Sequence, residues 1–167
     1  MTTLGSDLQL NQFRQSAVRG SLDQAYNFNN IPGKVASANG VVGGDMVVMT
    51  SGANGVPQYE EVVATDTEAG LADALKGFVV KNLKQNVVES NVGCVGVALE
   101  GSVMRMIAEE AIASGAKVAY DATTTVPANT GKILNNPASP VTGQIACGIA
   151  LDTATADGDL IRVYIKF

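Results

Sequence analysis

The sequence predicts an all-β protein, either a compact β-barrel or a jelly-roll-like sandwich, with an extended N-terminal arm and at most one or two short helices. The chain is 46% hydrophobic but only 5% aromatic, and its 18 Gly with abundant Val and Thr suit short strands joined by tight turns. In residues 160–167, one face of an extended chain would carry Ile161, Val163, Ile165 and Phe167, and the other face would carry the residues between them. This two-residue period indicates a half-buried strand. At 167 residues the chain is long enough for one domain with its own core.

Residues 1–34 are expected to form the arm, and residues 35–167 a β-rich body. The first segment is rich in Asn, Gln and Ser, and its scattered apolar residues keep neither a helical nor a strand period. Pro32-Gly33 would be its hinge. The segment carries three basic and two acidic residues in a chain of net charge −5, which is either chance in a small sample or the sign of an acidic partner.

In the body, each expected strand is a short apolar stretch between turn signals. Residues 67–75 are the exception, because Ala and Leu there favour a short helix capped by Asp66 or Thr67. Val118 to Tyr120 lie in a further apolar stretch before Asp121. The other expected strands, in chain order, are residues 41–42, 46–49, 59–64, 78–83, 87–88 and 92–99.

Residues 103–113 fit either a helix or a strand, since they contain good helix formers. An internal repeat favours the strand. Residues 96–100 (GVALE) match residues 148–152 (GIALD), and an apolar stretch around a single Arg, Arg105 or Arg162, follows each copy. We therefore expect a strand to about Ala108 and two similar hairpins, each made of an apolar strand, an acidic turn and an Arg-containing strand.

The residue types exclude most enzyme chemistry. The chain has no His, so it has no Ser-His or Cys-His nucleophile and no His-ligated metal. The Glu pairs at 60–61 and 109–110 would point to opposite faces of an extended chain and are expected to be solvated. No Gly-rich stretch has phosphate-loop spacing, and residues 157–159 (DGD) lack the ligand series of a calcium loop. We expect no enzyme activity, no metal and no cofactor.

Charge and cysteine content limit the partners and the compartment. A net charge of −5 and a pI near 4.6 argue against nucleic-acid binding, which needs a surplus of Lys and Arg. Cys94 and Cys147 lie in apolar, Gly-rich stretches and are expected to be buried, inert thiols. The N-terminus does not resemble a signal peptide, and no apolar run approaches about 18 residues, so we expect a soluble protein made in a reducing compartment and no membrane partner.

Two segments carry a family resemblance. Residues 115–124 (GAKVAYDATT) and residues 148–163, from GIALD to DGDLIRV, resemble the capsid cement, or head decoration, proteins of tailed bacteriophages. Residues 19–24 (RGSLDQ) and 31–35 (IPGKV) look like the opening of such proteins. The resemblance covers roughly the last third of the chain and a patch near its start, and its motifs are turns and strands rather than chemistry.

The resemblance implies a structural protein that binds the outer surface of a phage head, bridges major capsid protein subunits and stabilises the shell. It would be made in the host cytoplasm and end on the virion as a homotrimer or homodimer. Its partner would be the major capsid protein, with no nucleic acid, membrane or cofactor. The alternative from another class is a soluble β-sandwich module that binds carbohydrate or a host surface, although a chain with no Trp and four Tyr is poorly supplied for sugar stacking.

The expected capsid or subunit interface combines arginines with aromatic side chains. Arg105 and Arg162 lie either on the solvated face of an edge strand or against acidic groups of a neighbouring subunit. Tyr59 is a further candidate anchor, whereas Tyr120 is expected to fill the core. The expected interface residues of the arm are Phe13, Arg14, Arg19, Tyr26 and Phe28.

Overall fold

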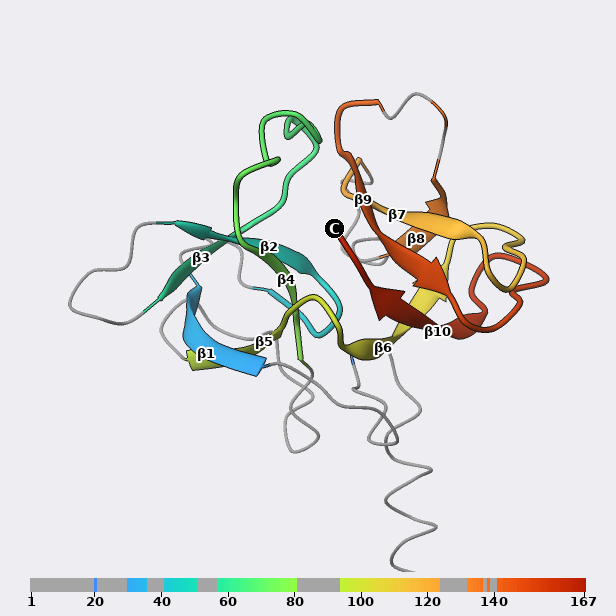
Figure 1. Ribbon diagram of the computed structural model, residues 1–167, viewed down its shortest axis with the longest axis horizontal. Coiled ribbons are helices and arrows are strands. Elements are labelled where there is room, and N and C mark those ends of the chain that lie inside the picture. The colour runs from blue at the N-terminus through green and yellow to red at the C-terminus, as the bar shows by residue number, and fades with distance from the viewer. Residues whose placement is uncertain are drawn as a thin grey trace, which may run out of the picture.

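A computed structural model describes residues 20, 30–35, 41–50, 57–80, 94–123, 132–136, 138 and 141–167. These residues form ten strands and no helix, which confirms the all-β prediction (Figure 1). None of them belongs to a helix that is long and apolar enough to cross a membrane. The strands are β1 (Asn30–Val35), β2 (Met46–Thr50), β3 (Gln58–Glu61), β4 (Lys76–Val79), β5 (Cys94–Ala98), β6 (Val103–Ala108), β7 (Lys117–Asp121), β8 (Lys132–Asn135), β9 (Gln144–Ala150) and β10 (Leu160–Ile165).

The strands close into two five-stranded rings that lie side by side (Figure 1). The first ring runs β1-β3-β2-β4-β5 and returns to β1, and the second runs β6-β8-β7-β9-β10 and returns to β6. Every strand therefore has two neighbours, and neither ring has a free edge strand. Of the two architectures expected from the sequence, the barrel is the one observed.

The two rings have the same topology. In each, the first and third strands pair in parallel, through two residue pairs, and the other four pairings are antiparallel. Strands β1 to β5 thus correspond in order to β6 to β10. The fold is a tandem repeat of one five-stranded unit.

The repeat seen in the sequence is out of phase with this structural repeat. Residues 148–152 end β9 and lead into β10, which does pair with β9 as a hairpin. Residues 96–100, in contrast, end β5 and connect the two rings, because β5 pairs with β4 and β1 while β6 pairs with β10 and β8. The expected strand at residues 103–108 is confirmed, but the expected hairpin before it is wrong, since the chain changes rings there.

The segment expected to form a helix at residues 67–75 is a series of turns. Only the Leu71 N–H bonds the carbonyl four residues back, at Thr67 (3.1 Å), and Gly70 interrupts the segment with a residue of low helix propensity. Thr67 still accepts a cap-like hydrogen bond from the Gly70 N–H (3.1 Å). Contacts outside the segment hold it: Glu68 Oε2 accepts a hydrogen bond from the Ala146 N–H of β9 (2.6 Å).

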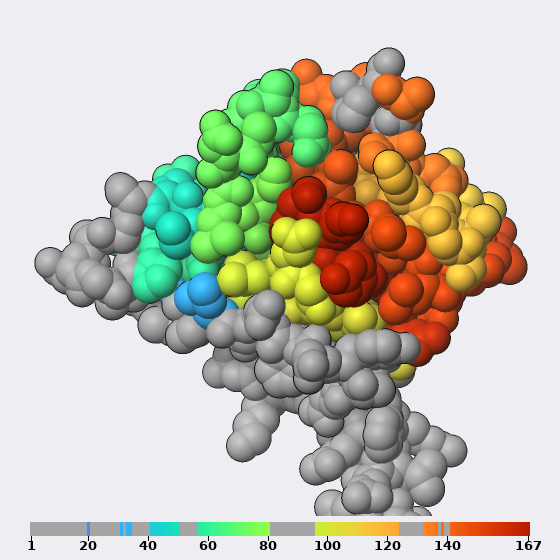
Figure 2. Space-filling view, in the orientation of Figure 1, coloured from blue at the N-terminus to red at the C-terminus, as the bar shows by residue number. Residues whose placement is uncertain are grey.

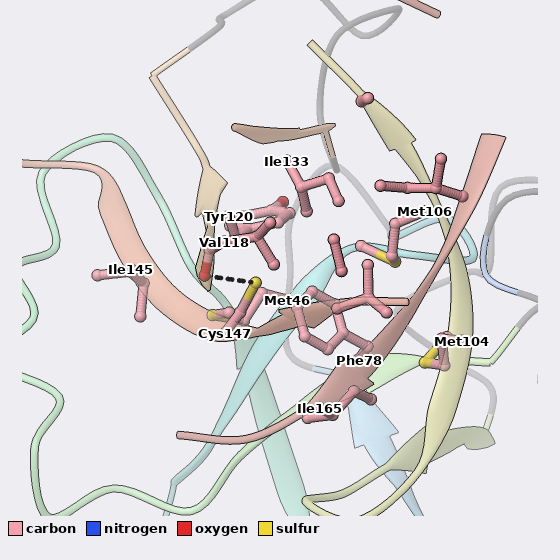
Figure 3. Close-up of a cluster of buried hydrophobic side chains, with 14 of the residues drawn as sticks. Met46, Phe78, Met104, Met106, Val118, Tyr120, Ile133, Ile145, Cys147 and Ile165 are labelled. Carbon is pink, nitrogen blue, oxygen red and sulfur yellow. Dashed lines mark hydrogen bonds between the residues drawn. The ribbon is translucent and has the colours of Figure 1, made fainter. Parts of the chain in front are cut away.

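One hydrophobic cluster spans both rings (Figure 3). Met46 and Phe78 come from the outer face of the first ring and pack among residues of the second, such as Met104 and Tyr120. The Phe78 ring meets Tyr120 edge-on, with centroids 5.8 Å apart, and stacks against Phe167 at 6.3 Å. The rings therefore share a core and are expected to fold together.

A second, smaller cluster fills the first ring. It consists of Val41, Val47, Tyr59, Val79 and Val97, all of them buried. A Cβ at the position of Gly33 would overlap the Tyr59 ring, so this close approach requires glycine. Tyr59 is fully buried, and its proposed role as an interface anchor is wrong because its ring is needed to fill the barrel.

Strand β1 begins inside the segment that was expected to form the arm. Residues 30–34, which the sequence placed in the arm, belong to β1 and pair with β5. Of the remaining arm residues only Gly20 is described. At the other end of the chain, β10 pairs with β6 and β9, and Phe167 packs against the shared core as the alternation predicted.

Candidate interaction surface

The two arginines singled out from the sequence face each other on neighbouring strands of the second ring. Arg105 of β6 is the register partner of Arg162 of β10. Neither lies on an edge strand, because β6 also pairs with β8 and β10 with β9. The expected interface residues of the arm, Phe13, Arg14, Arg19, Tyr26 and Phe28, lie outside the described residues.

Strand alternation places both arginines on the outer face of the second ring. The residues directly before and after each arginine along its strand point into the shared core. Strand β10 is visible in dark red on the face of the molecule shown in Figure 2, beside the yellow connection from β5. We call this outer surface the arginine face; it consists of Arg105, Ile107, Asp152, Leu160, Arg162 and Tyr164.

Asp152 neutralises one of the two arginines. Its carboxylate accepts hydrogen bonds from Arg162 Nη2 (2.7 Å), from Nε (2.9 Å) and from the backbone N–H (2.9 Å). These bonds, above all those from the guanidinium, hold the pKa of Asp152 below its ordinary value, and the charge of Arg105 acts in the same direction. Both side chains of the pair are about one-third exposed, so water screens the interaction.

Among the described residues, no carboxylate accepts a hydrogen bond from Arg105. Its side chain is partly buried, and its Nε is a buried donor without a hydrogen-bond partner. Its backbone carbonyl accepts a hydrogen bond from the Gly20 N–H (2.7 Å). Gly20 has a φ of +74°, and a Cβ there would overlap the backbone of Gly43 and Gly44, so glycine is required where the N-terminal segment meets both rings.

A group of charged residues near the β6–β8 closure was not recognised from the sequence. Glu109 was expected to be solvated, but it is partly buried, with Oε2 buried and without a hydrogen-bond partner. Burial raises the pKa of Glu109, as do the nearby Asp121 and Asp157 carboxyls, against the opposing charge of Lys132. Lys132 itself pairs with Asp157 at 2.7 Å. The pairings of β6 with β8 and of β8 with β7, which no local sequence pattern predicts, bring Glu109, Lys132 and Asp121 together.

A hollow of about 400 Å³ lies where the two rings meet. Figure 2 shows the green segment before β4, the yellow β5–β6 connection and the dark red C-terminus converging there. The ammonium group of Lys76, which lines the hollow, already has partners. Its Nζ donates a hydrogen bond to the Leu71 carbonyl (3.0 Å) and lies 5.4 Å from the centre of the Phe167 ring. The hollow is lined by Ala72, Ala74, Leu75, Lys76, Leu99, Glu100 and Phe167.

The other residues considered for chemistry have structural roles in the part of the chain that is described. Asp159 caps its own turn by accepting hydrogen bonds from the N–H groups of Thr155 (2.6 Å) and Ala156 (3.1 Å). Cys147 is fully buried, burial raises the pKa of its thiol, and the side chain of Cys94 is not described. Across the described ranges no three His, Cys, Asp or Glu side chains are grouped to hold a metal ion.

Comparison with known proteins adds a fold similarity at a low level. No protein-family model and no curated protein matches the chain. Among solved structures, the chain is similar to the head fiber gp8.5 N base of bacteriophage phi29, with a TM-score of 0.49 and 15% sequence identity over 84% of this chain and 95% of that one. A similarity at this level carries no argument about function, so the proposal that follows depends on the residues of this chain.

Proposed function

We propose that this chain is a structural protein of a tailed-bacteriophage head, which binds the outer surface of the shell, bridges major capsid protein subunits and stabilises the shell. One observation carries the proposal. The segments that resemble capsid cement proteins, residues 115–124 and 148–163, supply β7, the end of β9 and most of β10. These three strands are consecutive neighbours in the second ring, so the resemblance covers one continuous part of a single sheet.

The architecture determines how such a protein would make contact. Closed rings offer no edge strand on which a partner could add a strand, so binding would use outward side chains, loops and the N-terminal segment. A contact of about 1,200–2,000 Å² per site is sufficient, because a homotrimer or homodimer that engages several shell subunits gains occupancy through multivalency. The mechanical role is then to add interface area in many symmetric copies.

Cosedimentation with phage heads that lack the protein tests this function. The purified full-length chain is expected to pellet with heads and to remain in the supernatant without them. A chain that stays in the supernatant with heads contradicts the proposal. A second variant lacks residues 1–19 and so begins at Gly20, whose N–H makes the first contact that the structure describes. We expect this variant to remain folded and to bind heads more weakly, as an adhesive arm requires.

The same assay separates the alternative function. A module for carbohydrate or a host surface would ignore heads and bind glycans or host cells instead. Among the aromatic side chains in the described ranges only Tyr164 is exposed, so a sugar-stacking platform has little support there.

A further inference from the structure

We propose that Arg105, and not Arg162, is the cation through which the arginine face binds a carboxylate of the major capsid protein. This inference rests on the proposed function and names the contact that would carry it. Its basis is the difference between two arginines that are direct neighbours in the same sheet.

The arginine face holds two like charges side by side. Two arginines directly opposite each other on antiparallel strands repel, and a carboxylate between them would relieve the repulsion. Asp152 is that carboxylate, but within the described residues every hydrogen bond that it accepts comes from Arg162, in a bidentate arrangement with an additional bond from the backbone N–H. Arg162 is thus committed to a structural pair.

Arg105, in contrast, has a buried donor group. Its Nε is buried without a hydrogen-bond partner, so the folded protein has already removed water from part of this guanidinium without giving it an acceptor. The remaining nitrogens of the fork suit a carboxylate from outside, because Arg binds carboxylates in a planar, two-bond geometry. In the free protein, the position is therefore preorganised for an acidic partner.

Aromatic and aliphatic side chains flank the two arginines. Tyr164, which is 37% exposed, lies next along β10 from Arg162, while Ile107 and Leu160 form a partly buried pair on the other side. An arginine flanked by a tyrosine and aliphatic side chains has the composition of a protein-binding hot spot, in which the apolar rim excludes water from the ion pair. In a chain of net charge −5, a cation on the outer face also orients an acidic partner.

The experiment compares charge-reversed full-length variants in head cosedimentation. Arg105→Glu is matched by Lys117→Glu, which makes the same charge change at an exposed residue of β7 in the same ring. We expect Arg105→Glu to weaken binding by about 100-fold or more, and Arg105→Lys, which keeps the charge but loses the fork, by about 10-fold. Lys117→Glu is expected to bind within about twofold of the wild type. Circular dichroism of each variant verifies that it is folded, and Arg105→Lys provides the comparison if Arg105→Glu does not fold.

The outcomes separate this inference from the proposed function. Wild-type protein that does not pellet contradicts the function itself. Wild-type protein that pellets together with an equally tight Arg105→Glu variant contradicts only the role of Arg105, and so does an equal loss in Arg105→Glu and Lys117→Glu. If Arg105→Glu loses binding because it no longer oligomerises in analytical ultracentrifugation, the carboxylate belongs to a second copy of this chain and the assignment to the capsid protein is wrong.

Discussion

Phe78 is the residue whose removal best tests whether the two rings form one cooperative unit. It extends from β4 of the first ring into the cluster that fills the second, where it contacts Tyr120 and Phe167. Phe78 is 1% exposed, so Phe78→Ala leaves a cavity in the shared core. Such substitutions cost about 3–5 kcal/mol, including the lost aromatic pairing of about 1 kcal/mol. Since domains of this kind are stable by about 5–15 kcal/mol, the loss is a large fraction of the total.

Urea unfolding of Phe78→Ala, followed by far-ultraviolet circular dichroism and by tyrosine fluorescence, measures this effect. We expect a single transition for both probes, at a lower urea concentration than in the wild type, because both rings depend on the same cluster. Leu75→Ala is the control: Leu75 is 39% exposed, and its loss is expected to cost less than about 1 kcal/mol. A cost below about 2 kcal/mol for Phe78→Ala, or a second transition that the substitution leaves unchanged, would show that the rings are independent.

Three further predictions follow from the charges and glycines of the fold. Because the pKa of Glu109 is raised in the folded protein, the wild type loses stability as pH rises from the ordinary pKa near 4.5 through the higher folded pKa. The free energy of unfolding of Glu109→Gln, measured by urea titration, is therefore expected to rise relative to the wild type between pH 4 and pH 7, and a difference that does not change with pH contradicts this. Because the pKa of Asp152 is lowered in the folded protein, its contribution to stability is present above the ordinary pKa of 3.8 and is lost as pH falls through the lower folded pKa. Asp152→Asn is expected to lower the free energy of unfolding by about 1 kcal/mol at pH 7 and by almost nothing at pH 2, and an equal cost at both pH values would refute the pairing. Gly20→Ala is expected to lower the melting temperature more than Gly115→Ala does, because both residues have positive φ but only the Cβ at Gly20 meets other atoms; equal effects would mean that the Gly20 contact contributes nothing.

The strands that the sequence predicted best are those with a clear local pattern. Strand β10 alternates between core and surface along its whole length, and β6 was recognised although its residues also suit a helix. Residues 67–75 show the opposite case, because their helix formers are held in turns by contacts such as Glu68 to Ala146, which lies 78 residues away. Intrinsic helix propensity is a weak preference, and tertiary contacts of this kind override it.

The geometry of the arginine face was predicted in part. The residue types and the alternation of β6 and β10 identified Arg105 and Arg162 as outward charges, but they could not separate the two. The separation comes from Asp152, which bonds Arg162 ten residues away across the β9–β10 turn, whereas no carboxylate in the described part of the chain bonds Arg105. The carboxyl groups around Glu109 were missed for a similar reason, since a strand pairing rather than a sequence motif assembles them.

By itself, the sequence determined that this protein is built from short strands, which side chains of its last strand face a core, and which chemistries lack the necessary residues. Those properties depend on side-chain type and on the two-residue period of a strand, both of which are local. Only the tertiary structure decided that the strands close into two rings of identical topology and that Phe78 joins their cores. Strand partners are chosen by long-range packing and hydrogen bonding, which the order of residues along the chain does not display.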